Sequence, residues 1–156
     1  MSLHKICTAQ SSQFKALPRN AFYIELLGTG GPYSLNYERL LSRQNIGGLR
    51  YGVGITLLPT YQGLTQRLTK LWGKGEHHAE TGLGILVARQ NDPEAFDFNN
   101  RNGYVIRIHL SPQVGYRYQK NTAGLLFRAT YTPWINYYSG QVRFRNWAGI
   151  SIGKMF

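Results

Sequence analysis

Apolar and polar residues alternate along most of the chain after residue 19, and a period of two residues is typical of a strand with one apolar face. The pattern is most regular over Gly48–Leu58. Its apolar positions are Leu49, Tyr51, Val53, Ile55 and Leu57, with arginine, glycine and threonine between them. Because successive side chains of a strand point to opposite faces, this segment has one apolar face and one small, polar face.

Seven more segments carry the same alternation, so the sequence predicts eight strands. The predicted strands are 21–28, Tyr33–Leu41, Gly48–Leu58, Leu64–Gly73, His78–Ala88, Tyr104–Gln119, Leu125–Trp134 and Trp147–Phe156. The fourth of them is the least regular, because Lys70 interrupts its apolar face. Pro112 has no N–H for a ladder hydrogen bond, which predicts a bulge or bend in the sixth strand.

The connections between the predicted strands alternate in length. Connections two, four and six are short, at Ser42–Asn45, Lys74–His77 and Lys120–Gly124. Connections three, five and seven are Pro59–Gly63, Gln90–Gly103 and Ile135–Asn146, and the last two of these are long. Outer-membrane barrels have short turns at the periplasmic end and longer loops at the other end. The rhythm of the connections therefore favours a membrane barrel, with the first connection as a short exception.

The polar faces of the predicted strands carry ionisable side chains. They are Glu25, Glu38, Arg50, Glu80, Arg107, His109, Arg117 and Arg128. In a small soluble barrel these charges would displace the apolar core, whereas in a membrane barrel lipid surrounds the apolar faces and opposite charges can pair inside. Closure of a barrel also pairs the backbone groups that lie in hydrocarbon. Glycines on the polar faces leave room for the arginines, so we predict a filled interior without an open pore.

We therefore predict an all-β fold, an eight-stranded antiparallel up-and-down transmembrane β-barrel, over residues 20–156. Residues 1–19 are expected to be a flexible leader or the remnant of an export signal. The single cysteine, Cys7, excludes a disulfide within the chain. The alternative fold is a soluble antiparallel barrel or sandwich with its apolar faces inward. That fold would place the glycines on strand faces exposed to water, where they only weaken a strand.

The chain is strongly basic, with 18 lysine and arginine residues against 7 aspartate and glutamate residues and a formal charge of +11. Such a charge favours anionic partners: lipopolysaccharide, anionic lipid headgroups or nucleic acid. Aromatic residues near the strand ends fit either nucleobase stacking or the girdles at the two membrane interfaces. They are Tyr23, Tyr33, Trp72, Tyr104, Tyr118, Trp134, Tyr137, Tyr138 and Trp147. Their positions favour girdles, so we expect outer-membrane lipid and lipopolysaccharide as partners and no nucleic acid.

The segment Trp147–Phe156 resembles the C-terminal β-signal of outer-membrane barrels, in which alternating apolar residues precede an aromatic residue. Ile150, Ile152 and Phe156 match that pattern, and Lys154 departs from it because an apolar or aromatic residue is usual there. The resemblance implies recognition by the barrel-assembly machinery and location in the bacterial outer membrane.

Other stretches resemble the small, mostly uncharacterised eight-stranded outer-membrane barrel proteins of Gram-negative bacteria. They are Tyr33–Arg39, Gly73–His78, Glu80–Gly84, Gly115–Tyr118, Phe127–Arg128 and Thr132–Pro133. None of these stretches is an active-site signature. The resemblance implies fold and location and leaves activity open.

Glu76, His77, His78 and Glu80 are the first group with candidate chemistry, because zinc prefers histidine and carboxylate ligands. The two histidines are adjacent, however, and on a strand they would point to opposite faces. We therefore expect no metal and no other cofactor.

His109 and Ser111 are the second group, two residues apart on one strand face. They resemble the catalytic pair of outer-membrane lipid A deacylases, in which a carboxylate orients the histidine. The sequence has no aspartate or glutamate after Asp97, so the acid expected downstream is missing. A histidine held by a third group is central to activating a serine, and we predict no enzymatic activity.

The expected function is structural or interactive: a membrane anchor, a binder that uses its surface loops, or an accessory subunit of a larger outer-membrane assembly. Two alternatives stay open. One is a lipid A-modifying outer-membrane enzyme that uses His109 and Ser111. The other is a soluble basic β-barrel that binds nucleic acid.

Overall fold

The computed structural model describes residues 18–43, 48–91, 103–120, 123–138 and 141–156. The predicted leader, residues 1–19, lies outside this part of the chain except for its last two residues. The strands are β1 (Asn20–Leu27), β2 (Tyr33–Arg43), β3 (Gly48–Leu58), β4 (Tyr61–Trp72), β5 (His77–Asn91), β6 (Tyr104–Gln119), β7 (Gly124–Tyr131), β8 (Trp134–Tyr138), β9 (Gln141–Arg145) and β10 (Ala148–Met155). Among the described residues, no helix is long and apolar enough to cross a membrane.

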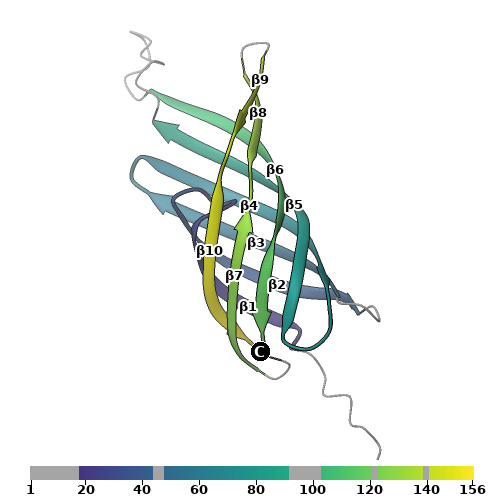
Figure 1. Ribbon diagram of the computed structural model, residues 1–156. Helices are drawn as coiled ribbons and strands as arrows, with labels where there is room; N and C mark the ends of the chain where they lie inside the picture. Colours follow the sequence, from purple (N-terminus) through teal and green to yellow (C-terminus); the bar gives the residue numbers. More distant parts are fainter. Residues whose placement is uncertain (1–17, 44–47, 92–102, 121–122, 139–140) are drawn as a thin grey trace, which may run out of the picture.

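Eight of these strands close into an antiparallel barrel in the order β1-β2-β3-β4-β5-β6-β7-β10, with β10 paired to β1 (Figure 1). Barrel neighbours are consecutive along the chain apart from the inserted β8–β9 hairpin, so the predicted up-and-down barrel is confirmed. The backbone N–H groups of Asn20 and Phe156 each donate to the other residue's carbonyl oxygen at 2.9 Å. We term this end of the barrel the terminal end and the opposite one the hairpin end.

The β8–β9 hairpin continues the β7–β10 pair beyond the barrel wall (Figure 1). The register is unchanged across the interruption, since Tyr131 faces Ala148 in one pair and Trp134 faces Arg145 in the other. The predicted loop over Ile135–Asn146 is therefore wrong. β9 does alternate, with Val142 and Phe144 between polar residues, but it is only five residues long and every one of them is exposed. The sequence therefore did not identify it as a strand.

Pro112 causes no shift of register between β5 and β6, so the bulge predicted there is wrong. On its other side, β6 pairs with β7 as far as Val114 and with β8 at Leu110. The proline, which has no N–H to donate, thus lies where this ladder is already interrupted. The sheet has a register shift in β2 instead, between Leu40 and Ser42.

The barrel is apolar outside and polar inside. Val53 and Ile108 are 37% and 63% exposed, whereas Arg50 and Arg117 on the opposite faces of the same strands are 0% exposed. Each barrel strand exposes large apolar side chains, for example Phe22, Leu35, Val53, Leu64, Ile85, Ile108, Phe127 and Ile150. A continuous apolar belt around a polar interior is the arrangement of a barrel surrounded by lipid.

β4 is longer than predicted, because it begins at Tyr61 and leaves only Pro59–Thr60 between β3 and β4. Its inward face carries the fully buried Arg67. The cation that obscured its pattern, Lys70, has its ammonium group 4.0 Å from the ring centroid of Trp72. A cation–π contact of this kind holds the charge against the apolar belt.

The aromatic residues divide between the two sides of the wall. Trp72 and Tyr104 are exposed near opposite ends of the barrel, and the guanidinium of Arg89 lies 3.9 Å from the Tyr104 ring centroid. Tyr23 and Trp134 are instead buried, so their assignment to a girdle is wrong. Both occupy inward positions of their strands, so their side chains lie inside the barrel although they stand near strand ends.

Candidate functional site

Seven charged side chains form one network across the interior of the barrel. Each of the strands β1 to β7 contributes one member, in chain order Glu25, Glu38, Arg50, Arg67, Glu80, Arg117 and Arg128. All seven are at most 1% exposed. The alternation of each strand places these residues inward, next to outward-facing apolar neighbours.

One half of the network is centred on Glu38 and Glu80. Glu38 lies 3.3 Å from Arg50 and 2.8 Å from Arg117. Arg117 continues to Glu80 at 3.5 Å, and Glu80 accepts hydrogen bonds from Arg128, one of them from Nε at 3.1 Å. Each of the two carboxylates therefore lies between two guanidinium groups.

The other half is centred on Glu25. Its two carboxylate oxygens accept hydrogen bonds from both terminal nitrogens of Arg67, at 3.1 and 2.9 Å, and Arg128 lies 3.9 Å away. The hydroxyl of Ser151 in β10 donates to Glu25 at 3.4 Å, so all eight barrel strands are connected. The Tyr23 ring lies beside both cations, 5.6 Å from Arg67 and 5.0 Å from Arg128.

This arrangement suits a structural role better than a catalytic one. Each of the three carboxylates is shared between two arginines, which leaves it poorly placed to act as a general base or metal ligand. Removing one partner of such a buried pair lowers the free energy of unfolding by about 3–5 kcal/mol. The network therefore crosses the lumen and links the walls.

The network contains six of the eight interior residues predicted from the sequence. The other two, Arg107 and His109, lie nearer the hairpin end, where they line a separate pocket. At about 3.3 Å per residue, His109 is some 26 Å along β6 from Arg117. Arg67 was missed because Lys70 made its strand look irregular; the polar alternation of Thr65, Arg67 and Thr69 is the signal that would have found it.

His109 and Ser111 share the inward face of β6, as predicted. The His109 ring packs against Trp134, with the ring centroids 4.9 Å apart. Within the described part of the chain, neither ring nitrogen of His109 nor the hydroxyl of Ser111 has a hydrogen-bond partner. The histidine is thus not oriented by a carboxylate among these residues, which serine activation would require.

The candidate metal ligands of the β4–β5 turn point in different directions. His77 is exposed, with Nδ1 2.6 Å from the Tyr116 hydroxyl oxygen, whereas His78 is buried. Glu76 accepts a hydrogen bond from Tyr118, and Glu80 belongs to the lumen network. No three histidine, cysteine, aspartate or glutamate side chains in the described ranges are grouped to hold a metal ion.

The turn between β1 and β2 folds into the barrel from the hairpin end. Thr29 in this turn is fully buried, and a Cβ placed on Gly84 in β5 would lie 2.7 Å from its methyl group. The Thr56 hydroxyl oxygen lies 2.7 Å from the carbonyl oxygens of both Gly30 and Tyr33. The turn is therefore anchored inside the barrel and adds a second obstruction to the lumen.

A second group of cations lines a pocket of about 320 Å³ at the hairpin end. Arg107 and His109 of β6 form one side, and Trp134, Arg143 and Arg145 of the β8–β9 hairpin form the other. The sequence did not indicate this site, because Arg143 and Arg145 fall in the segment predicted to be a loop.

Comparison with known proteins adds one structural relative. No protein-family model matches the chain, and no curated protein sequence matches it. The structure is similar to the N-terminal β-barrel domain of Pseudomonas aeruginosa OprF, with a TM-score of 0.53, covering 89% of this chain and 99% of that one. The two sequences are 12% identical, so the likeness shows a shared β-barrel fold.

Proposed function

We propose that the protein is an integral outer-membrane β-barrel of Gram-negative bacteria with a structural role, as an anchor or as an accessory subunit of a larger outer-membrane assembly. The observation that carries this proposal is the inverted distribution of residues. Apolar side chains such as Ile24, Ile55 and Ile152 are exposed, while the charged side chains of the network are enclosed. Lipid is the surrounding medium in which this distribution is stable.

The filled interior supports anchoring rather than transport. The seven-residue network crosses the lumen, and Thr29 and its turn occupy it nearer the hairpin end. Interiors of eight-stranded barrels are just wide enough to be filled by side chains. Binding to other molecules would then use the outer surface and the two rims.

The test is fractionation of Gram-negative cells that produce the full chain, combined with gel mobility before and after heating. We expect the protein in the outer-membrane fraction, extracted only by detergent, with an unheated band that migrates differently from the heated band. Recovery of a folded barrel from the soluble fraction without detergent would contradict the proposal and favour the soluble, nucleic-acid-binding alternative.

The proposal includes assembly by the barrel-assembly machinery through Ile150, Ile152 and Phe156. All three are exposed on the outer face, and the backbone of Phe156 pairs with Asn20. Phe156→Ala keeps those backbone bonds and removes only the aromatic ring. It should lower the amount of assembled barrel several-fold, whereas Lys154→Ala, on the same face, should not; equal yields would count against this route.

The proposal assigns no enzymatic activity to the chain. His109 is packed against Trp134 rather than paired with a carboxylate among the described residues. Ser111→Ala should therefore leave the acylation of lipid A unchanged when the lipid is analysed by mass spectrometry. A difference between wild-type and variant cells would favour the lipid A-modifying alternative.

A further inference from the structure

The barrel wall has an opening between β6 and β8 towards the hairpin end. Among the described residues, these two strands pair at one position only, Leu110 with Ile135. β6 continues for six residues beyond that pair, to Tyr104, and remains paired to β5 on its other side. The two strand edges that face each other across the opening are therefore not joined by a ladder there.

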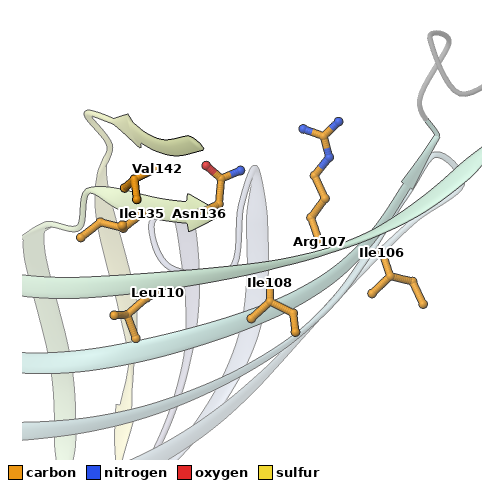
Figure 2. Close-up of a pocket in the computed structure, with 7 residues that line it drawn as sticks. All are labelled: Ile106, Arg107, Ile108, Leu110, Ile135, Asn136 and Val142. Atoms are coloured by element: carbon orange, nitrogen blue, oxygen red, sulfur yellow. The ribbon is translucent and has the colours of Figure 1, made fainter. Parts of the chain in front are cut away.

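The outer side of this opening is an apolar groove of about 530 Å³. Its walls are Ile106, Ile108 and Leu110 of β6 and Ile135 and Val142 of the hairpin. Figure 2 shows the three β6 side chains on one side of their strand and Arg107 extending from the opposite side. The groove belongs to the apolar belt, at its limit near the hairpin end.

The inner side of the opening is the basic pocket described above. Arg107 and Asn136 line both the groove and the pocket, so the two adjoin at the opening. Arg143 and Arg145 add two more guanidinium groups to the pocket, and Arg145 lies 5.1 Å from the Trp147 ring centroid. The groove and the pocket, which we call the cleft, thus place an apolar surface beside three arginine side chains.

We propose that this cleft binds lipid A, with an acyl chain in the groove and a phosphate group among the arginines. The ligand must be both apolar and anionic to match the two halves of the cleft. Guanidinium groups recognise phosphate through two parallel hydrogen bonds, and the acyl chain continues the surroundings of the apolar belt. The choice of lipid A rests on the proposed function, because in an outer-membrane barrel the end opposite the termini lies in the outer leaflet.

The terminal end offers a matched comparison. Arg19 and Arg39 line a pocket of about 430 Å³ there, with Leu40 and Leu41 as the other wall residues. This pocket also combines arginine with apolar side chains, but it lies at the opposite rim. Loss of its charges tests whether any pair of rim arginines has the same effect.

The experiment is native mass spectrometry of the detergent-purified full chain titrated with diphosphoryl lipid A, dephosphorylated lipid A, phosphatidylglycerol or inorganic phosphate. We expect one diphosphoryl lipid A per chain. Binding should weaken about tenfold or more when the phosphates are removed, or in the Arg143→Gln/Arg145→Gln variant, as loss of charge-assisted hydrogen bonds predicts. Both arginines lie on β9, whose residues are exposed and which is not one of the eight strands that close the barrel.

The apolar half of the cleft is tested separately. Ile106→Ser/Val142→Ser should weaken binding of diphosphoryl lipid A, whereas Leu57→Ser/Ile152→Ser, which alters two similarly exposed residues elsewhere on the belt, should not. Phosphatidylglycerol should bind less tightly than diphosphoryl lipid A, and inorganic phosphate should not compete.

Three outcomes would overturn the inference. They are equal binding of lipid A with and without phosphates, an equal loss of lipid A binding in Arg19→Gln/Arg39→Gln, and a bound mass that corresponds to a peptide in place of lipid A. Heat-modifiable mobility is measured on the same samples. If the barrel forms and resides in the outer membrane but lipid binding is unselective, only the lipid site is wrong. If the barrel is not found in that membrane, the proposed function itself fails.

Discussion

At the scale of single residues, Glu25 and Arg67 form a bidentate ion pair in the lumen. Both partners are removed from water, and two parallel hydrogen bonds of 3.1 and 2.9 Å join them. The desolvation of each charge is offset by the other, so the pair is best understood as a unit. Removing one member leaves a buried charge without its main partner.

This pairing predicts strong coupling between two substitutions. Arg67→Met should lower the free energy of unfolding by about 3–5 kcal/mol in the wild-type chain and by much less when Glu25 is already glutamine. Urea titrations of the protein in detergent measure both values. Glu76→Gln, which removes a carboxylate bound to Tyr118 at the rim, should change the free energy of unfolding far less, because water screens the interaction there. Additive costs for the two lumen substitutions would contradict the network.

Gly153 makes a second prediction at this scale, because it lies on the seam where β10 meets β1. A Cβ at Gly153 would lie 2.2 Å from the Phe22 carbonyl oxygen and 2.4 Å from the Tyr23 Cβ. Gly153→Ala should therefore destabilise the barrel by about 1–3 kcal/mol and reduce the unheated folded band on gels. Gly124→Ala is the control, since the nearest contact there is the flexible Lys120 side chain at 3.3 Å. Equal stability of the two variants would show that the seam can adjust.

At the scale of elements, the sequence predicted a strand well wherever one face was enclosed. β3 and β6 follow their predicted bounds, because an inward face lined by glycine, arginine and serine contrasts with an apolar outward face. β9 has no enclosed face, and its alternation covers only five residues, which is too short to distinguish a strand from a loop. The same limit hid the arginine pocket, which depends on the position of that hairpin beside β6.

The sequence predicted that charged residues lie inside the barrel, but it did not predict all of the residues that form the network. Alternation fixes the side of the wall on which a residue lies, which placed Glu38, Glu80 and Arg128 inside. It does not fix the height of a residue in the barrel, because that depends on register and strand tilt. The sequence pattern therefore grouped Arg107 and His109 with network residues that lie much nearer the terminal end of the barrel.

The β1–β2 turn gives a prediction for an element. Thr56 holds this turn in the lumen through contacts of 2.7 Å to the carbonyl oxygens of Gly30 and Tyr33. Thr56→Val keeps the shape of the side chain and should cost about 1–3 kcal/mol of stability by leaving a buried acceptor unpaired. Hydrogen exchange at the Gly31 amide should become faster. The matched control is Thr65→Val, since the Thr65 hydroxyl has no partner in the described part of the chain; an equal loss of stability in the control would mean that the hydrogen bonds are not the cause.

At the scale of the whole molecule, the apolar belt stabilises the outer surface of the barrel and the charged network stabilises its interior. The apolar belt is stable in lipid, and lipid disfavours charged groups on the outer face, but it does not offset the desolvation of the charges enclosed in the lumen. The network offsets it by pairing opposite charges, and it links residues as distant in the chain as Glu38 and Arg117. Contacts between such distant positions can form only once the strands are arranged around a common axis, so ion pairing and closure of the β1–β10 seam should occur together.

The charged side chains that cross the lumen lead to the last prediction, which concerns conductance. Arg67, Tyr23 and Arg128 lie against one another across the interior, and Thr29 obstructs it again towards the hairpin end. Folded protein inserted into a planar lipid bilayer in concentrated KCl should therefore give no discrete conductance steps. Thr29→Gly should be equally silent, because the ion network alone fills the cross-section, whereas Glu80→Gln should introduce irregular current noise by releasing Arg117 and Arg128. Uniform conductance steps from the folded wild-type chain would mean that a continuous water path passes the arginines. That result would contradict the anchoring role and favour a channel.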